Sequence, residues 1–429
     1  MRILSLVVCT AVTAVTTPLI AQDSLGRDPV SLLQVLDSVA ARYPSLEAAR
    51  ARVRAARGSR STAGTLGNPM LMYQMDNAPL PGRAAPPMDR EMTLTATLPL
   101  EPLYQRWSRV SGANAEVRAA EADAQADRQR IELDATRAFY RMARAQVALA
   151  AARDLTAWLD SVVAYNRTRV TEGVAAEADL IRSELERDRA AVDATMQEAD
   201  LARARADLSV FLGDQPAAPF LAAALDAPFA LPDAALASRA GSARPDIRAA
   251  RARVAAAGSG VTTERTNFIR QLGLTLGTKH TSGTTSLIAG VSMPFPLFDQ
   301  NRGAIARASA EREAATFDLA AQERIGRAEI VGAAESARLL TERAAVLAGP
   351  ARGQGYLARA DEARRIALGA YREGAVPLIQ VIDAARAWGE AQFVYYQILY
   401  AQHESVVQLL VAEGVDIAST LPTLTETRP

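Results

Sequence analysis

Cysteine and histidine are almost missing from this sequence. Among 429 residues there is one cysteine, Cys9, and there are two histidines, His280 and His403, which lie far apart in the chain. Cys9 falls inside a predicted N-terminal leader, so the mature chain has neither a disulfide nor a thiolate. Zinc and redox sites built on closely spaced cysteine and histidine are therefore excluded, and we expect no cofactor.

Net charge is missing as well, because 48 basic residues balance 48 acidic residues. No strong field of one sign points to nucleic acid as a partner. The sequence also lacks a Ser/His/Asp set or a pair of acids at a recognisable spacing, so we do not expect an enzyme.

Long apolar runs are confined to the start of the chain. Residues 1–21 begin Met-Arg, continue as an apolar block through Cys9 and end in small residues at Ala21, which is the order of a secretory signal peptide. A buried N-terminal strand or helix is the alternative, and a lipid anchor on Cys9 is disfavoured because Val8 is bulky. Beyond the leader no stretch reaches the roughly 18 apolar residues of a spanning helix, so a membrane crossing would need strands.

The sequence contains an internal repeat. Residues 43–56 return as residues 244–257, with Val53 and Val254 in register, and Gly173 and Gly374 are separated by the same 201 positions. We therefore predict two equivalent halves. They span residues 22–213 and 236–413, joined by a proline-rich loop at 214–235 and followed by a tail at 414–429.

Each half is predicted to run helix, two strands, one very long helix, a glycine tip and a return helix. A long helix of this kind would extend about 100 Å, and Gly349 with Pro350 predicts a kink in the second one. In the first half the ranges are about 68–78 and 90–100 for the strands, then 105–172, 173–176 and 177–213. In the second half they are about 270–280 and 285–295, then 301–373, 374–377 and 378–413.

The predicted strands alternate between apolar and small or polar residues. Residues 92–98 interleave apolar residues with threonine, and residues 272–277 and 287–293 alternate similarly, which suits lipid on one face and water on the other. Four strands cannot close a barrel in lipid, so we predict a trimer with twelve strands around a water-filled passage. The alternative is a soluble hairpin in a secreted coiled-coil structural or adhesion protein without a pore.

The first long helix carries two apolar stripes. One is mostly alanine at heptad spacing, which lets helices approach closely, and the other includes Phe139, Trp158 and Val162. Because such a helix can face two neighbours, a ring of helices is predicted. The heptad stripe comprises Ile131, Ala135, Ala138, Met142, Ala145, Leu149, Ala152, Thr156, Leu159 and Val163.

Beside this repeat, two segments resemble the TolC-like outer-membrane efflux proteins. They read VSMPFPLFDQNRGAIA at residues 291–306 and YREGAVPLIQVIDA at residues 371–384. The resemblance covers nearly the whole mature chain. It implies a mainly α-helical homotrimer with a transmembrane β-barrel in the outer membrane and a helical barrel in the periplasm. It also implies a periplasmic adaptor protein and an inner-membrane efflux pump as partners, for instance a pump of the resistance-nodulation-division type, and no chemistry catalysed by this chain.

The resemblance also suggests a gate near the tips. By position after the tip glycines, Asp179 and Asp383 match acidic residues of the family's gate and Tyr371 matches its inter-hairpin tyrosine, whereas Gln380 stands where relatives have a second acid. Three Asp383 carboxylates around a narrow bore would favour cations. Asp179 is the predicted latch, and a solvated charge on a helix face is the alternative for both acids.

The tips themselves are predicted to bind the adaptor. Their apolar side chains have no core to join if the tips project into water, so we expect them to be exposed, although ordinary turn packing is the alternative. The predicted docking residues are Gly173, Val174, Gly374, Val376 and Leu378.

Methionines cluster in the first hairpin, at Met70, Met72, Met75, Met88 and Met92. Thioethers can bind copper(I). The alternative is that these methionines simply face lipid or lie in a loop, since alternation would place Met70, Met72 and Met92 on apolar faces. The pair before the first strand, at positions 68 and 69, resembles the heavy-metal branch of the family. Together these features favour metal cations over drugs as the exported substrate.

Overall fold

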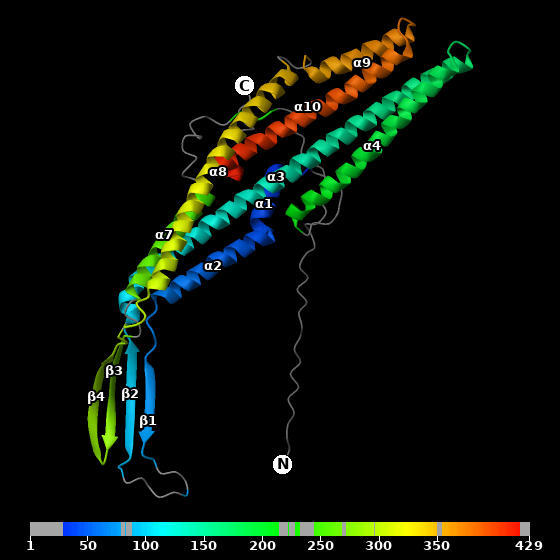
Figure 1. The fold of residues 1–429 in the computed structure, drawn as a ribbon. Coiled ribbons are helices and arrows are strands. Elements are labelled where there is room, and N and C mark those ends of the chain that lie inside the picture. Colours follow the sequence, from blue (N-terminus) through cyan, green and yellow to red (C-terminus); the bar gives the residue numbers. More distant parts are fainter. Residues whose placement is uncertain are drawn as a thin grey trace, which may run out of the picture.

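The computed structural model describes residues 29–78, 82, 88–213, 222, 228–231, 244–267, 272–295, 297–349 and 354–420. The predicted leader, most of the predicted inter-repeat loop and the end of the predicted tail lie outside these residues. The molecule is elongated, with a small sheet at one end and two helical tips at the other (Figure 1). The prediction of a mainly helical chain with four strands is confirmed.

The two halves of the chain share one order of elements. The first half contains α1 (Leu32–Arg42), α2 (Pro44–Gly64), β1 (Met70–Asp76), β2 (Glu91–Pro99), α3 (Glu101–Thr171) and α4 (Glu177–Leu212). The second contains α7 (Pro245–Thr266), β3 (Gly273–Thr281), β4 (Thr284–Ser292), α8 (Arg302–Ala348), α9 (Tyr356–Arg372) and α10 (Leu378–Glu413). The strands are shorter than the predicted ranges, and α3 begins four residues before position 105.

The longest element is α3, whose 71 residues extend about 107 Å. Pro102 stands in its first turn, where proline costs no intrahelical hydrogen bond. Helix α3 packs against α4 and also against α10, so it has two long neighbours. Most of the predicted heptad stripe is buried along this helix, including Ala135 and Met142, whereas Ile131, Ala152 and Thr156 are half-buried. None of the helices within the described residues combines the length and apolar character that a membrane crossing requires.

The second long rod is interrupted. The single helix predicted for residues 301–373 is wrong, because α8 ends at Ala348 and α9 begins at Tyr356. The predicted kink at Gly349 is confirmed as a complete break, since Gly349 takes φ +80, a left-handed conformation that glycine adopts without strain. A Cβ on Gly355 would lie 2.4 Å from the Ala348 carbonyl oxygen, so the chain approaches itself too closely for any other residue.

The four strands form one antiparallel sheet in the order β1-β2-β3-β4. The pairing of β2 with β3 joins the two halves of the chain, and β1 and β4 are left as the edges. On β2 and β3 the threonine-rich face is less exposed than the leucine-rich face, as in Thr95 (buried) against Leu94 and Leu276 (exposed). The sheet is therefore concave toward threonine and convex toward leucine.

The main core lies midway along the rods, where α1, α3, α4 and α10 meet. Its largest fully buried side chains include Phe139 and Met142 of α3, Leu36 of α1 and Leu208 of α4. Helix α1 is fixed at its start by a capping box, in which Ser31 and Gln34 satisfy each other's backbone N–H groups. Phe139 and Val162, both from the second predicted stripe, are fully buried, and Trp158 is partly buried.

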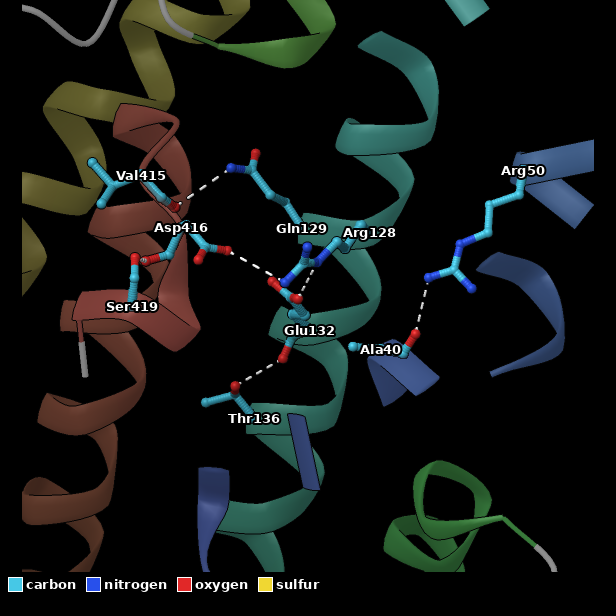
Figure 2. A network of polar contacts seen from close by, with 9 residues as sticks. All are labelled: Ala40, Arg50, Arg128, Gln129, Glu132, Thr136, Val415, Asp416 and Ser419. Atoms are coloured by element: carbon cyan, nitrogen blue, oxygen red, sulfur yellow. Dashed lines mark hydrogen bonds and ion pairs between the residues drawn. The ribbon is translucent and has the colours of Figure 1, made fainter. Parts of the chain in front are cut away.

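A polar network ties the end of α10 to α3 (Figure 2). Arg128 donates to Glu132 at 2.6 Å and lies 3.6 Å from Asp416, while Gln129 donates to the Val415 carbonyl at 3.4 Å. The Glu132 carboxylate is almost fully buried, and its desolvation raises its pKa although Arg128 opposes the shift. The segment after α10 is thereby fixed against the middle of the long rod.

Candidate functional site

The two helical tips have the same backbone geometry. Gly173 between α3 and α4 has φ +74, and Gly374 between α9 and α10 has φ +77. In each tip the glycine N–H donates to a carbonyl three residues back, and the next N–H donates five residues back, to Arg169 and Ala370 respectively. These are Schellman-type ends, which need glycine because of the positive φ. Each tip thus reverses the chain within a few residues.

The second tip carries its own hydrophobic core. Leu378 is 3% exposed and packs with Val162, Tyr371, Val381 and Ile382. The prediction that Leu378 is exposed for docking is therefore wrong. The sequence could not show that α3 of the other half supplies a partner in Val162.

The remaining docking candidates differ in exposure. Val174 is 60% exposed, whereas Val376 is half-buried against the tip core, which contradicts the expectation that both are exposed. Ile379, which the sequence analysis did not single out, is exposed beside the buried Leu378. The apolar surface that the tips offer to a partner thus consists mainly of Val174 and Ile379.

Tyr371 is the centre of the polar contacts near the tips. Its hydroxyl donates to Asn166 Oδ1 of α3 at 2.7 Å, and Arg169 of α3 lies 5.5 Å from its ring centre. Burial raises the pKa of Tyr371, the nearby Arg169 cation opposes this, and the Asp179 carboxylate adds to it. The structure therefore places the Asp179 charge near Tyr371 and makes Asn166 the buried hydrogen-bond partner of the tyrosine. The sequence signal for Asn166 is a polar residue in an apolar stripe of the helix.

The other two predicted gate residues lie apart from this cluster. Gln380 and Asp383 are exposed on α10. The nearest cation to Asp383 among its ion pairs is Arg386, at 4.0 Å, which is a weak contact at an exposed site. Within one chain these two side chains are therefore on the exposed surface of α10.

An arginine between two tryptophans joins α9 to the other rods. The Arg364 guanidinium lies 4.0 Å from the Trp388 ring centre and 5.4 Å from that of Trp158. It also contacts Asp154 of α3 at 3.4 Å and Asp361 of α9 at 3.0 Å, and its side chain is only 13% exposed. The stack links α9, α10 and α3 just above the tip core. Sequence reasoning missed it, because the partners come from three separate helices.

The concave face of the sheet is polar and hydrogen-bonded. Thr97 of β2 and Thr275 of β3 share a hydrogen bond of 2.9 Å, and Lys279 lies 2.6 Å from Glu91 near the far end of the same face. A face of this kind can line water, while the convex face of leucine, alanine and valine can meet lipid.

The register corrects the predicted positions of two methionines. Met70 lies opposite Thr97 and Met72 opposite Thr95, so both belong to the concave polar face. Met92 alternates with those threonines and belongs to the convex apolar face, as predicted. The error arises because β1 has apolar residues at successive positions, so its alternation does not identify a face.

Two exposed apolar stripes run along opposite edges of the helical region. Neither stripe is covered by the part of the chain that the structure describes. On α4 the stripe comprises Ile181, Leu185, Val192, Met196 and Val210. On α8 it comprises Phe317, Ile325, Val331, Leu339 and Val346.

The described residues thus form a sheet with open edges, carried on paired helical rods that leave apolar stripes exposed. The outer membrane efflux protein family matches the sequence twice, at residues 35–214 and 236–415. The chain belongs to this family. The two matches begin 201 residues apart, at 35 and 236, which is the interval of the internal repeat.

Solved outer-membrane channels share the fold. OprN is 22% identical with a TM-score of 0.74, and the match covers 90% of each chain. CusC is 16% identical with a TM-score of 0.73, covering 90% of this chain and 92% of its own. Campylobacter jejuni CmeC is 15% identical with a TM-score of 0.73, covering 92% and 89%. Among curated protein sequences none matches this chain significantly.

Family membership fixes the broad role. The chain is an outer-membrane efflux channel with a helical extension into the periplasm, and it is not an enzyme. Proteins of this family form trimers and work with an adaptor and an inner-membrane pump.

Proposed function

We propose that this chain is the passive exit duct of a tripartite efflux system, assembled as a homotrimer with a twelve-stranded barrel. In this assembly substrates pass from a periplasmic adaptor and an inner-membrane pump, of the resistance-nodulation-division type, to the exterior. The observation that carries the proposal is the pair of unsatisfied edges on one protomer, in the sheet and in the helices.

The sheet edges support assembly with copies of the chain. Within the described residues, strands β1 and β4 each pair on one side only, so each leaves a row of backbone N–H and C=O groups without a strand partner. In hydrocarbon every such group costs several kcal/mol when unpaired. Pairing β1 of one copy with β4 of the next satisfies both edges, and three copies supply enough strands for a water-filled barrel.

The helical edges support the same arrangement. The stripe on α4 and the stripe on α8 lie on different elements, so a contact between them is heterologous, and a heterologous contact that closes makes a ring. Helix α10 packs between α9 and α3 within one chain. Adding α4 against the neighbour's α8 continues the row into a closed helical wall.

The tip contacts support a gate closed by the hairpins. Tyr371 and Asn166 hold the α9 end against α3, and Asp179 acts as the latch beside them. Asp383 and Gln380, exposed on α10, would face the bore, where three Asp383 carboxylates favour cations. Gly173, Gly374, Val174 and Ile379 would offer the adaptor its contact at the tips, with Val376 at the margin.

The lean toward metal cations as cargo rests on two features. Asn68 and Pro69 resemble the heavy-metal branch of the family. Met70 and Met72 lie on the polar face that lines the passage in the proposed barrel, where thioethers could meet a soft cation.

The trimer can be tested on the α4 stripe. We expect the purified chain to run as a trimer that resists heat in detergent and to give step-like conductance in planar bilayers. Replacing Val192 with Asp should abolish the trimer, because a charge would be buried against α8 of the neighbouring copy. Replacing Asp193 with Asn, on the same turn but outside the stripe, is the control. A monomer that is soluble without detergent would instead favour a secreted coiled-coil protein without a pore.

The cargo requires a test in cells. Deleting the gene should sensitise the cells to metal ions more than to dyes and antibiotics, and the wild-type gene should restore tolerance. Sensitivity to drugs with normal metal tolerance would overturn the metal assignment and leave the duct intact.

A further inference from the structure

Three potential metal ligands form a row across the sheet. Met75 of β1 lies directly opposite Met92 of β2, and Met92 lies directly opposite His280 of β3. Residues opposite each other in antiparallel strands project from the same face. The three side chains therefore stand side by side on the convex face, near the strand ends that Figure 1 shows farthest from the helices.

The spacing of the row allows the three side chains to meet. Neighbouring strands are about 5 Å apart, so Met75 and His280 each need to lean about 5 Å to reach a point above Met92. Methionine has three rotatable bonds and adapts to irregular sites. Met92 and His280 are half-buried, whereas Leu94 and Thr278 in the next row of this face are exposed. Met75, at the edge of the row, is exposed.

The imidazole is oriented by a residue of the fourth strand. His280 Nδ1 lies 3.1 Å from Thr285 Oγ1, and Thr285 is opposite His280 in the register. A hydrogen bond at one ring nitrogen fixes the ring and presents the other, Nε2, to a ligand, as happens in metal sites supported from outside. The row thus has two thioether sulfurs, one imidazole nitrogen and a support for the ring.

The donor set selects the type of cation. The charged residues within β1, β2 and β3 at this end, Asp76, Glu91 and Lys279, alternate with the row and belong to the opposite face. The row therefore offers no carboxylate oxygen. Thioethers with imidazole suit a soft monovalent ion, whereas calcium and magnesium require oxygen ligands.

We propose that Met75, Met92 and His280 bind one copper(I) or silver(I) ion per chain on the convex face, at the end of the sheet away from the helices. This site lies on the opposite face from the threonines that line the proposed passage, so it is separate from the export route. It does not depend on which substrate is exported. A bound ion also ties three strands together and stabilises the folded sheet.

Silver(I) is the probe, because it is soft and does not change oxidation state under the assay. The full chain is purified in detergent, loaded, passed through a desalting column and titrated with a competing thioether chelator. We expect about one silver per chain in the wild type, and at least about 10-fold weaker binding in Met92→Leu, which conserves volume. Thr285→Val, which removes the support of the ring, should weaken binding by about 10-fold to 100-fold.

The matched control is Met293→Leu, the same substitution at an exposed methionine just after β4, outside the row. It should retain wild-type silver affinity. The proposal is overturned if the wild type loses its silver on the column, if Met92→Leu binds as the wild type does, or if the control loses binding equally. Conductance and trimer formation of Met92→Leu should match the wild type, so a negative binding result leaves the proposed duct unaffected.

Discussion

The Tyr371 hydroxyl donates a hydrogen bond of 2.7 Å to Asn166 Oδ1, and both residues are buried. The two residues come from different halves of the chain, on α9 and α3. This hydrogen bond therefore connects the two hairpins close to their tips. Removing one partner of a buried pair costs about 1–3 kcal/mol, because the other partner loses its hydrogen bond without regaining water.

Replacing Tyr371 with Phe should loosen the contact between the hairpins. The Asn166 carbonyl oxygen would be left unsatisfied, which we expect to destabilise the tip by about 1–3 kcal/mol and to raise single-channel conductance. Planar-bilayer recording of the purified protein measures the change. Tyr356→Phe, at the start of the same helix, is the control and should conduct as the wild type does. Equal conductance in both variants would remove Tyr371 from the gate.

Replacing Asp179 with Ala should also raise conductance, since the predicted latch loses its charge beside Arg169 and Tyr371. Both Glu177 and Asp179 stand in the first turn of α4, where a negative charge stabilises the helix. Glu177→Ala therefore loses the same helix-end stabilisation without touching Tyr371. If the two variants conduct alike, Asp179 acts only as a helix-end charge and not as a latch.

Replacing Arg364 with Lys should weaken the attachment of α9. Lysine keeps the charge but loses the planar group that lies between Trp158 and Trp388, and each such contact contributes about 0.5–2 kcal/mol. We expect the heat resistance of the trimer to fall and tryptophan fluorescence to shift toward longer wavelength. The control is Arg365→Lys, because Arg365 is the next residue of the helix and its side chain is exposed. Unchanged fluorescence in Arg364→Lys would contradict a stacked arginine.

Replacing Gly277 with Ala should disrupt the sheet. A Cβ there would lie 2.2 Å from the Leu94 carbonyl oxygen and 2.7 Å from the Thr95 Cα, both of which belong to the backbone of β2 and cannot move aside. Gly290→Ala on β4 is a matched control, since nothing lies within 4 Å of the added atom. We expect only the first variant to yield little heat-resistant trimer. Normal assembly of Gly277→Ala would contradict the close approach of the β2 backbone to Gly277.

Replacing Glu413 with Gln should stabilise the protein at neutral pH. Glu413 is almost fully buried, and one of its carboxylate oxygens has no hydrogen-bond partner among the described residues. Burial raises the pKa of this carboxyl above its unfolded value, so folding favours the protonated form. Glu413 therefore stabilises the fold below its ordinary pKa, and that contribution is lost as the pH rises through the raised pKa.

The measurement for Glu413 is the unfolding midpoint in guanidinium as a function of pH. Glu413→Gln should gain over the wild type at pH 7 and lose this advantage in acid, where the wild-type carboxyl is protonated. Glu390→Gln, exposed on the same helix, should show no such trend. A gain of equal size at all pH values would rule out ionisation of Glu413 as its cause.

Features carried by a local pattern could be predicted from the sequence, and features made by distant partners could not. Alternation predicted β2, β3 and β4, and the glycine at position 349 indicated the interruption between α8 and α9. The burial of Leu378 depends on Val162, which lies in the other half of the chain. The stack around Arg364 depends likewise on Trp158 of α3. No spacing within one helix reveals such partners.

The open edges of β1 and β4 have a consequence for genetics. In a ring of three, each copy supplies an edge to one neighbour and receives one from the other, so a single chain with a faulty edge breaks the circle. When a cell expresses faulty and normal chains equally, only about one ring in eight contains normal chains alone. A defective allele of this protein should therefore be dominant over the normal one, and a null allele should not.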